Sequence, residues 1–334
     1  MHAGKKFGAI EFIVWTRRSI YCLATLSAIP TLLYFLGWKF LSFPWQPIAI
    51  MGTAVAFIVG FKNNASYSRL WEARQIYGSI INDSRSFGYV LRDSLSERNP
   101  KKVKEMFLRH YAWLTALRFQ LREPRAWENM NTAQFKEYAE KYDISEKLLN
   151  LDDELRNYLS DHELQYILSK KNRATQLMAS QSKELSEAYR NGEINDFQWT
   201  QINQQLIKFT DYQGRAERIK NFPYPRNFSS ITTYLLLLFI VFVPFGLLKE
   251  FDKLGEGTVI EGLTLWFNIP FSLLVTWCFH TLDSVGESSV NPFEGSANDV
   301  PITQISRTIE IDMRDMLDED NLPPPITAKN NIVL

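Results

Sequence analysis

The sequence predicts an all-α protein with four transmembrane helices and a helical cytoplasmic domain. The first reason is the distribution of charge. The 334-residue chain is 22% charged overall, yet residues 19–61 and 229–282 carry very few charges. Each of these stretches is long enough for two spans of about 20 residues, the length that crosses a bilayer. The second reason is that the charged segment between them places apolar residues at helical spacing.

Charge balance and missing motifs exclude several classes of function. The formal net charge is +0, so there is no electrostatic case for a nucleic-acid partner. The sequence contains no GxSxG, P-loop or HExxH motif, so we predict no enzyme, no catalytic residue and no cofactor. Cys22 and Cys278 lie in apolar stretches without metal-ligand spacing, so we expect small buried side chains and no metal site.

The first transmembrane hairpin is predicted over residues 19–63. Its first apolar run follows a basic N-terminal segment, residues 1–18, and is too long to be the apolar core of a signal peptide. After a short turn, Pro47 can begin a second helix, because the first helical position needs no N–H partner. That second helix carries no charge before Lys62.

The second transmembrane hairpin is predicted over residues 229–282. An apolar run over residues 229–248 contains Pro244, and a charged loop is expected over residues 249–253. Another apolar run follows over residues 258–282. Two hairpins therefore account for four spans.

An even number of spans places both chain ends on one side of the lipid bilayer. Lys5 and Lys6 precede the first hairpin, and Arg69 and Arg74 follow it. Basic residues of this kind mark the cytoplasmic side. We therefore expect a multi-pass protein of the cell (inner) membrane with both termini in the cytoplasm.

Residues 64–228 are predicted to form the helical cytoplasmic domain. Apolar and charged residues alternate at helical spacing over residues 142–149, 152–172 and 174–189. Gly192 follows an asparagine in a pattern that ends a helix, and Asn195 can cap the next one.

Residues 283–334 are predicted to be a cytoplasmic C-terminal segment and tail. Glu287 is expected to pair with an Arg or Lys of the extended second helix. The proline-rich end is expected to be loosely ordered or to wrap a neighbouring subunit.

The second helix carries the first candidate site. Thr53, Phe57 and Phe61 are spaced at i, i+4 and i+8, so they share one helix face. Such a face can form a hydrophobic constriction that gates a pore by dewetting, or it can pack against a neighbouring helix. Gly52 and Gly60 would allow another helix to approach closely. Spacing does not decide between the two interpretations.

Several sequence stretches together resemble the bestrophin family in its bacterial branch. These stretches are residues 60–74 (GFKNNASYSRLWEAR), 82–85 (NDSR), 217–219 (ERI), 243–247 (VPFGL) and 291–293 (NPF). Their order and spacing cover nearly the whole chain. None of them is specific alone, but the combination is.

The resemblance implies a homopentamer with one central pore and four membrane helices in each subunit. The family's second helix lines a narrow neck, and its three neck positions fall on Thr53, Phe57 and Phe61. A second constriction at the cytoplasmic mouth falls near Phe197, with Ile194 as a nearby candidate. The expected function is a pentameric channel that passively conducts monovalent ions.

The resemblance leaves the sign of the ion open. Family members conduct chloride in animals and plants, whereas a bacterial relative favours monovalent cations such as sodium. The pair Phe57 and Phe61 resembles the animal neck, which favours anions. A phenylalanine ring attracts an anion at its edge and a cation at its face, and the sequence does not fix the orientation.

Two other classes of function remain open at this point. The chain could be a membrane-anchored scaffold or sensor without transport activity, or a carrier, although its spans lack ionisable residues near their centres.

One feature of the animal family members is missing. Animal bestrophins hold calcium with an acidic run after the NPF motif. Here only Glu294 and Asp299 follow it, which is too few for the six to eight oxygens that calcium prefers.

Overall fold

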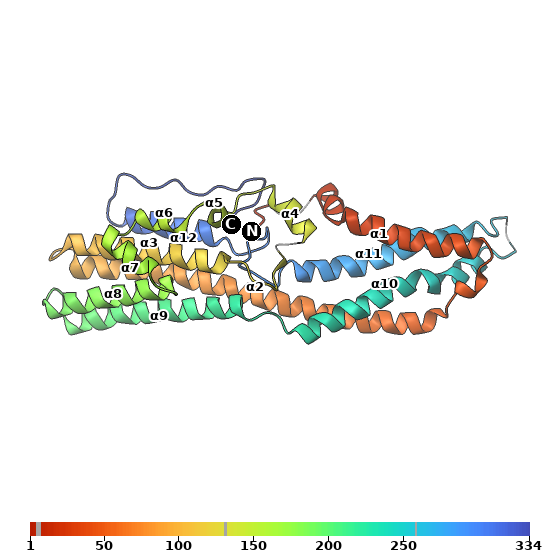
Figure 1. Cartoon of the computed structure of the whole chain (residues 1–334), viewed down its shortest axis with the longest axis horizontal. Helices are drawn as coiled ribbons and strands as arrows, with labels where there is room; N and C mark the ends of the chain where they lie inside the picture. Colours follow the sequence, from red (N-terminus) through yellow and green to blue (C-terminus); the bar gives the residue numbers. More distant parts are fainter. Residues whose placement is uncertain (5–7, 130–131, 258) are drawn as a thin grey trace. The chain divides into compact units, whose positions relative to one another are not determined.

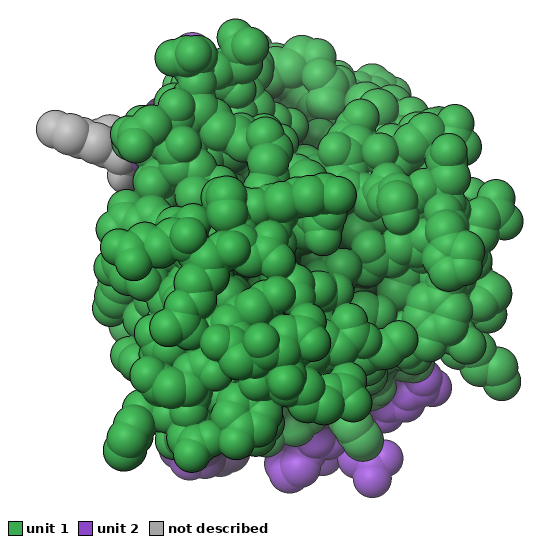
Figure 2. Space-filling model, turned by 90° about the vertical axis from the view of Figure 1, so that its left-hand side faces the viewer, with its two compact units in different colours: residues 1–3, 69–223, 291–334 green, residues 4–68, 224–290 purple. Residues whose placement is uncertain are grey.

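A computed structural model describes residues 1–4, 8–129, 132–257 and 259–334. Lys5 and Lys6, which contributed to the expected orientation, and Thr258, which begins the fourth apolar run, lie outside these residues. The chain is built from α-helices (Figure 1) and divides into two compact units. Unit 1 (green in Figure 2) contains residues 1–3, 69–223 and 291–334, and unit 2 (purple) contains residues 4–68 and 224–290.

Unit 2 consists of the apolar helices. They are α1 (Ala9–Phe35), the short η1 (Lys39–Leu41), the first part of α2 (Trp45–Leu95), α10 (Arg226–Leu254), η3 (Thr264–Phe267) and α11 (Asn268–Glu287). Among the described residues, three helical stretches are long and apolar enough to cross a membrane, at Lys39–Leu95, Arg226–Leu254 and Thr264–Glu287. Helix α1 occupies the place of the first expected span but is not among the three, and its sequence includes Arg17 and Arg18.

One helix boundary in unit 2 differs from the predicted one. The residues expected to form a charged loop, 249–253, belong to the last turns of α10. A change from apolar to charged residues marks a change of surroundings and not a helix end, because Lys and Glu are good helix formers. The expected extension of the second helix is confirmed, since α2 continues without a break to Leu95.

Close packing of α2 against α10 forms the core of unit 2. Val55 and Val59 of α2 are buried with Phe239 of α10. A Cβ atom at Gly52 would lie 2.7 Å from the Phe239 ring, so this glycine permits the contact as expected, whereas Gly60 has nothing within 4 Å. The glycine prediction is therefore right for one position and finds no support within the subunit for the other.

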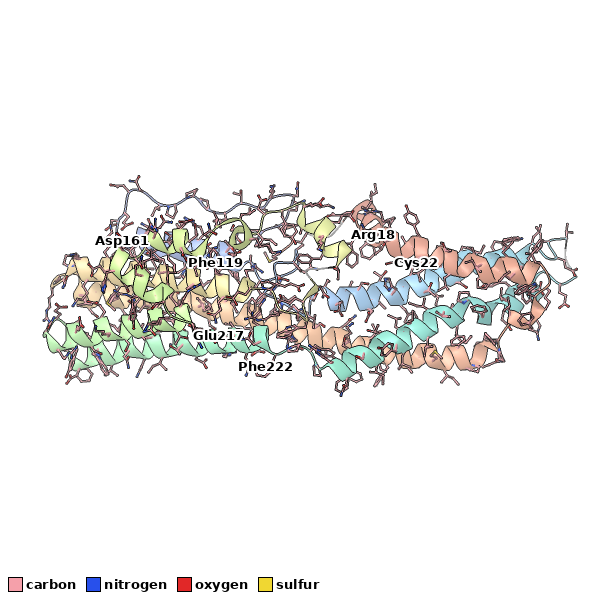
Figure 3. All side chains as sticks on the ribbon, in the orientation of Figure 1. Arg18, Cys22, Phe119, Asp161, Glu217 and Phe222 are labelled. Atoms are coloured by element: carbon pink, nitrogen blue, oxygen red, sulfur yellow. The ribbon has the colours of Figure 1, made fainter. Side chains whose placement is uncertain are left out.

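The two cysteines do not behave as expected. Cys22 on α1 (Figure 3) and Cys278 on α11 are free and exposed on the subunit rather than buried. A helix that faces lipid or another subunit can be apolar on every side. Apolar neighbours in the sequence therefore do not show that a residue is buried within its own subunit.

Unit 1 holds the charged helices. They are the second part of α2, α3 (Pro100–Arg122), α4 (Ala133–Ala139), α5 (Ser145–Leu148), α6 (Leu151–Arg156), α7 (Asp161–Leu168), α8 (Arg173–Arg190), α9 (Asp196–Asn221) and α12 (Ile302–Asp315). The predicted helix end is confirmed by Gly192, which has φ 71° just after α8. The predicted cap is confirmed too: Asn195 accepts a hydrogen bond from the backbone N–H of Gln198, whose side chain bonds back to Asn195.

The expected helices before α8 are shorter than predicted, and α3, α4 and α12 were not among the predicted helices. Residues 142–149 contain only one four-residue helix, and residues 152–172 are divided between α6 and α7. Helix α12 lies in the segment that was expected to be a tail. The very end of the chain is ordered rather than loose, because Ile332 is buried and pairs with His2 in an antiparallel bridge.

The core of unit 1 joins α2, α3 and α9 through aromatic and polar side chains. Trp113 donates a 2.9 Å hydrogen bond from its ring nitrogen to the Gln213 side chain. His110 is fully buried against Phe209 and lies 2.9 Å from the Ser84 hydroxyl. These contacts fix α9, which carries Phe197 at its first turn, on the rest of the unit.

Candidate functional site: the exposed face of the second helix

Helix α2 has two different faces where it passes through unit 2. Val55, Val59 and Lys62 point into the unit, with at most 2% of each side chain exposed. Phe57 and Phe61 point away from it and are 67% and 58% exposed. Large aromatic side chains on an exposed face of an apolar helix need a partner that the single subunit does not supply.

The two phenylalanines form one aromatic unit. Their ring centroids are 4.5 Å apart and their planes stand at 89°, so the edge of one ring meets the face of the other. Thr53 continues the same face one turn earlier. Its hydroxyl donates a 3.1 Å hydrogen bond to the Ala49 carbonyl of its own helix. The three predicted neck residues thus share one exposed face.

The buried face next to Phe61 is held by α11. The Lys62 ammonium lies 3.0 Å from Asp283 and 2.7 Å from Glu287, and the Asn63 amide donates a 2.9 Å hydrogen bond to the Leu282 carbonyl. The expected pairing of Glu287 with a basic residue of the second helix is confirmed. Sequence reasoning missed Asp283 and Asn63. Asp283 precedes Glu287 by four residues on the same helix, and this spacing could have indicated it as a second partner of the same cation.

The two candidate aperture residues lie in different environments. Phe197 is 88% exposed in the first turn of α9, whereas Ile194 is 3% exposed and belongs to the core of unit 1. A buried isoleucine cannot line an opening without leaving that core. Of the two, only Phe197 is available to a surface outside its own unit.

The segment after the neck carries exposed aromatics beside internal contacts. Tyr67 and Trp71 are 58% and 48% exposed. Arg69 donates a 2.9 Å hydrogen bond to the Ile219 carbonyl, and Glu72 pairs with Arg218 at 2.5 Å. The polar side of this stretch therefore fastens α2 to the end of α9, while the aromatic side stays on the surface.

The acidic residues after the NPF motif are engaged by protein donors. Asp299 accepts hydrogen bonds from the backbone N–H groups of Gly295 and Ser296, at 2.7 and 3.0 Å, and it pairs with Arg122 at 3.3 Å. Burial raises the pKa of Glu294, and the nearby Asp299 carboxylate raises it further. Within the described ranges, no cluster of three or more His, Cys, Asp or Glu side chains could hold a metal ion.

Comparison with protein families gives one match that covers most of the chain. The family described as bacterial and fungal bestrophin protein matches residues 10–315. Among curated relatives, the voltage-dependent anion channel-forming protein YneE of Escherichia coli K12 is 27% identical over 288 residues, which cover 86% of this chain and 81% of that protein. The voltage-dependent anion channel-forming protein RSc3414 of Ralstonia nicotianae is 25% identical over 291 residues, or 85% and 80%.

Comparison with solved structures supports the same fold. A crystal structure of a bacterial bestrophin homologue from Klebsiella pneumoniae superposes with a TM-score of 0.75 and covers 90% of this chain and 98% of that one, at 21% identity. Similarity at this level of identity concerns the fold alone. The predicted all-α fold is confirmed.

Proposed function

The chain belongs to the bacterial and fungal bestrophin family, and from this premise we propose that it forms a homopentameric membrane channel that passively conducts monovalent ions and prefers anions such as chloride. The observation that carries the proposal is the exposed face of α2. A ring of five subunits would turn five copies of Thr53, Phe57 and Phe61 toward one axis, where their aromatic surface is covered by the neighbouring subunits. The neck would then be narrow, apolar and free of charge.

The geometry of the aromatic pair favours anions. A phenylalanine ring is positive at its edge and negative at its face. Because the planes of Phe57 and Phe61 are perpendicular, the two rings cannot both turn their faces toward the same direction, whereas both can turn their edges. A cation passage lined by faces at both levels is therefore incompatible with this arrangement, and an anion passage lined by edges is compatible with it.

The names of the relatives agree with this preference. YneE and RSc3414 are both called voltage-dependent anion channel-forming proteins, and the chain covers about four fifths of each of them. The proposal extends that activity to this chain through the shared family. The alternative of a monovalent-cation channel keeps the same architecture and differs only in the orientation of the rings within the assembled pore.

The membrane arrangement belongs to the same proposal. Residues 19–63 and 229–282 would lie in the bacterial inner membrane, with residues 1–18, 64–228 and 283–334 in the cytoplasm. Helix α1 would be the fourth span. The other three spans are the stretches that are long and apolar enough to cross a membrane. Phe197 would form the cytoplasmic aperture, since Ile194 is committed to the core.

Purified protein in liposomes tests the proposal against a scaffold or sensor. Vesicles loaded with potassium chloride are diluted into an impermeant salt, and valinomycin carries potassium out to balance the charge. They should release chloride when they contain the protein, and release should not saturate as it would for a carrier. Protein that is folded and pentameric but releases no ion would overturn the channel assignment and favour the scaffold.

A further inference from the structure

One cluster of contacts behind the neck is not explained by packing alone. Lys62 follows Phe61 directly, but its side chain points the other way and is 2% exposed. Burying an ammonium group costs several kcal/mol unless it is paired. Here two carboxylates of α11 pair with it: Asp283, which is 16% exposed, and Glu287, which is 42% exposed.

A second contact joins the same two helices at the next residue. Asn63 donates its amide N–H to the Leu282 carbonyl at 2.9 Å. Gly286 lies against the same amide, where a Cβ atom would collide with the Asn63 oxygen. A glycine is thus what lets α11 come this close to α2. The ionic and the steric contacts are independent observations, and both lie within one turn of Phe61.

We propose that Lys62, Asp283 and Glu287, together with the contact between Asn63 and Gly286, form a latch that sets the position of Phe61 in the neck. The inference rests on the proposed channel function. These are positioning residues that do not line the pore. They fix the rotation and height of α2 at the inner end of the neck, and the position of α2 sets the diameter of the pore there. Conductance and ion preference should therefore depend on charges that never touch the ion.

The number of charges in the latch predicts which residue matters most. One ammonium faces two carboxylates, so the loss of Lys62 leaves two negative groups close together with no cation between them. Like charges in such a position repel or take up a proton. Either outcome removes the attraction between α2 and α11. The loss of Glu287 alone still leaves the pair between Lys62 and Asp283.

Single-channel recording of the full-length protein in planar bilayers tests the latch. We expect K62M to lose most of the wild-type conductance or to shift the reversal potential, E287Q to cause a smaller change in the same direction, and K62R to behave as wild type. The swap K62E/E287K keeps the net charge of the three residues and should recover part of what K62E loses. G286A should alter the neck without changing any charge.

The control is an ion pair in the same unit, between η1 and α10, near the residue at which α2 begins. Lys39 and Asp252 lie 3.0 Å apart, and about 25 Å of helix, at 1.5 Å per residue, separates Trp45, where α2 begins, from Lys62. K39M removes the same charge as K62M and should leave both conductance and reversal potential unchanged.

The outcomes separate the two claims. No current from folded wild-type pentamers would reject the channel itself. Current from the wild type with identical conductance and selectivity in E287Q, K62M and G286A would reject the latch and keep the channel. If K62M does not assemble, E287Q and G286A decide, because the first changes a half-exposed group and the second changes no charge.

Discussion

The rings of Phe57 and Phe61 meet edge to face, with centroids 4.5 Å apart and planes at 89°, on the one face of α2 that the subunit leaves exposed. Aromatic pairs of this kind hold each other's orientation with about 0.5–1.5 kcal/mol beyond their buried area. The pair therefore favours one mutual orientation. In the proposed pentamer five such pairs would define the narrowest part of the conduction path.

Removing both rings should widen the neck. We expect F57A/F61A to raise single-channel conductance and to weaken discrimination between anions of different size, because two apolar rings no longer restrict the hydrated ion. The control is F228A/F271A, which removes two phenylalanines that are 62% and 51% exposed elsewhere in unit 2. Unchanged conductance in F57A/F61A would place the constriction elsewhere.

The two aperture candidates should respond in opposite ways. I194A removes a buried side chain and should lower the free energy of unfolding by about 2–5 kcal/mol. F197A removes an 88% exposed ring, so stability should change by no more than about 0.5 kcal/mol while conductance rises. Denaturant titration in detergent measures the first effect and bilayer recording the second. A conductance change in I194A at normal stability would contradict this assignment.

His110 should make unit 1 sensitive to mild acid. Burial lowers the pKa of His110 from 6.5 to about 3. Between these two values the unfolded chain binds a proton that the folded chain does not, so stability falls as the pH decreases from about 6.5 to about 3. The slope approaches about 1.4 kcal/mol per pH unit.

The measurement is the unfolding midpoint of the full-length protein at pH 7 and pH 5. H110Q, which cannot titrate, should lose part of the difference between the two midpoints, whatever its own stability at pH 7. H162Q changes an exposed histidine on α7 and should keep the full difference. Equal pH dependence in H110Q and the wild type would mean that His110 is not the group responsible.

Arg122 should be essential to the stability of unit 1. It is 2% exposed on the side chain and pairs with Asp299, which is 1% exposed. R122M leaves that carboxylate buried without its cation, which typically costs about 3–5 kcal/mol. R125M removes a guanidinium whose partner Glu123 is 58% exposed, and it should cost no more than about 0.5 kcal/mol. Similar losses in the two variants would show that the pairing of Arg122 is not what stabilises the unit.

The sequence predicted those features that depend on local pattern. Charge-poor stretches predicted the apolar helices of unit 2, helix-capping residues predicted the start of α9, and i to i+4 spacing placed Phe57 and Phe61 on one face. Helix α12 has apolar residues at helical spacing, at Ile302, Ile309 and Met313. It was not predicted because the proline-rich sequence after it indicated a tail. These parts follow from residues close together in the chain.

The parts that could not be predicted depend on contacts between distant residues. Arg122 and Asp299 are 177 positions apart, and Lys62 and Asp283 are 221 apart. Nothing in the sequence around Arg122 indicates Asp299, and Asp283 could be found only through its spacing from Glu287. The burial of Ile194 and the exposure of Phe197 also depend on how α9 packs against α3 and α8, so both were candidates for one aperture on sequence alone.

The reversal potential of purified wild-type protein in a planar bilayer under a potassium chloride gradient tests the central claim most directly. A neck lined by phenylalanine edges predicts a current that reverses near the equilibrium potential of chloride. Reversal near the equilibrium potential of potassium would contradict the anion preference, and the absence of any current from folded, inserted protein would contradict the channel.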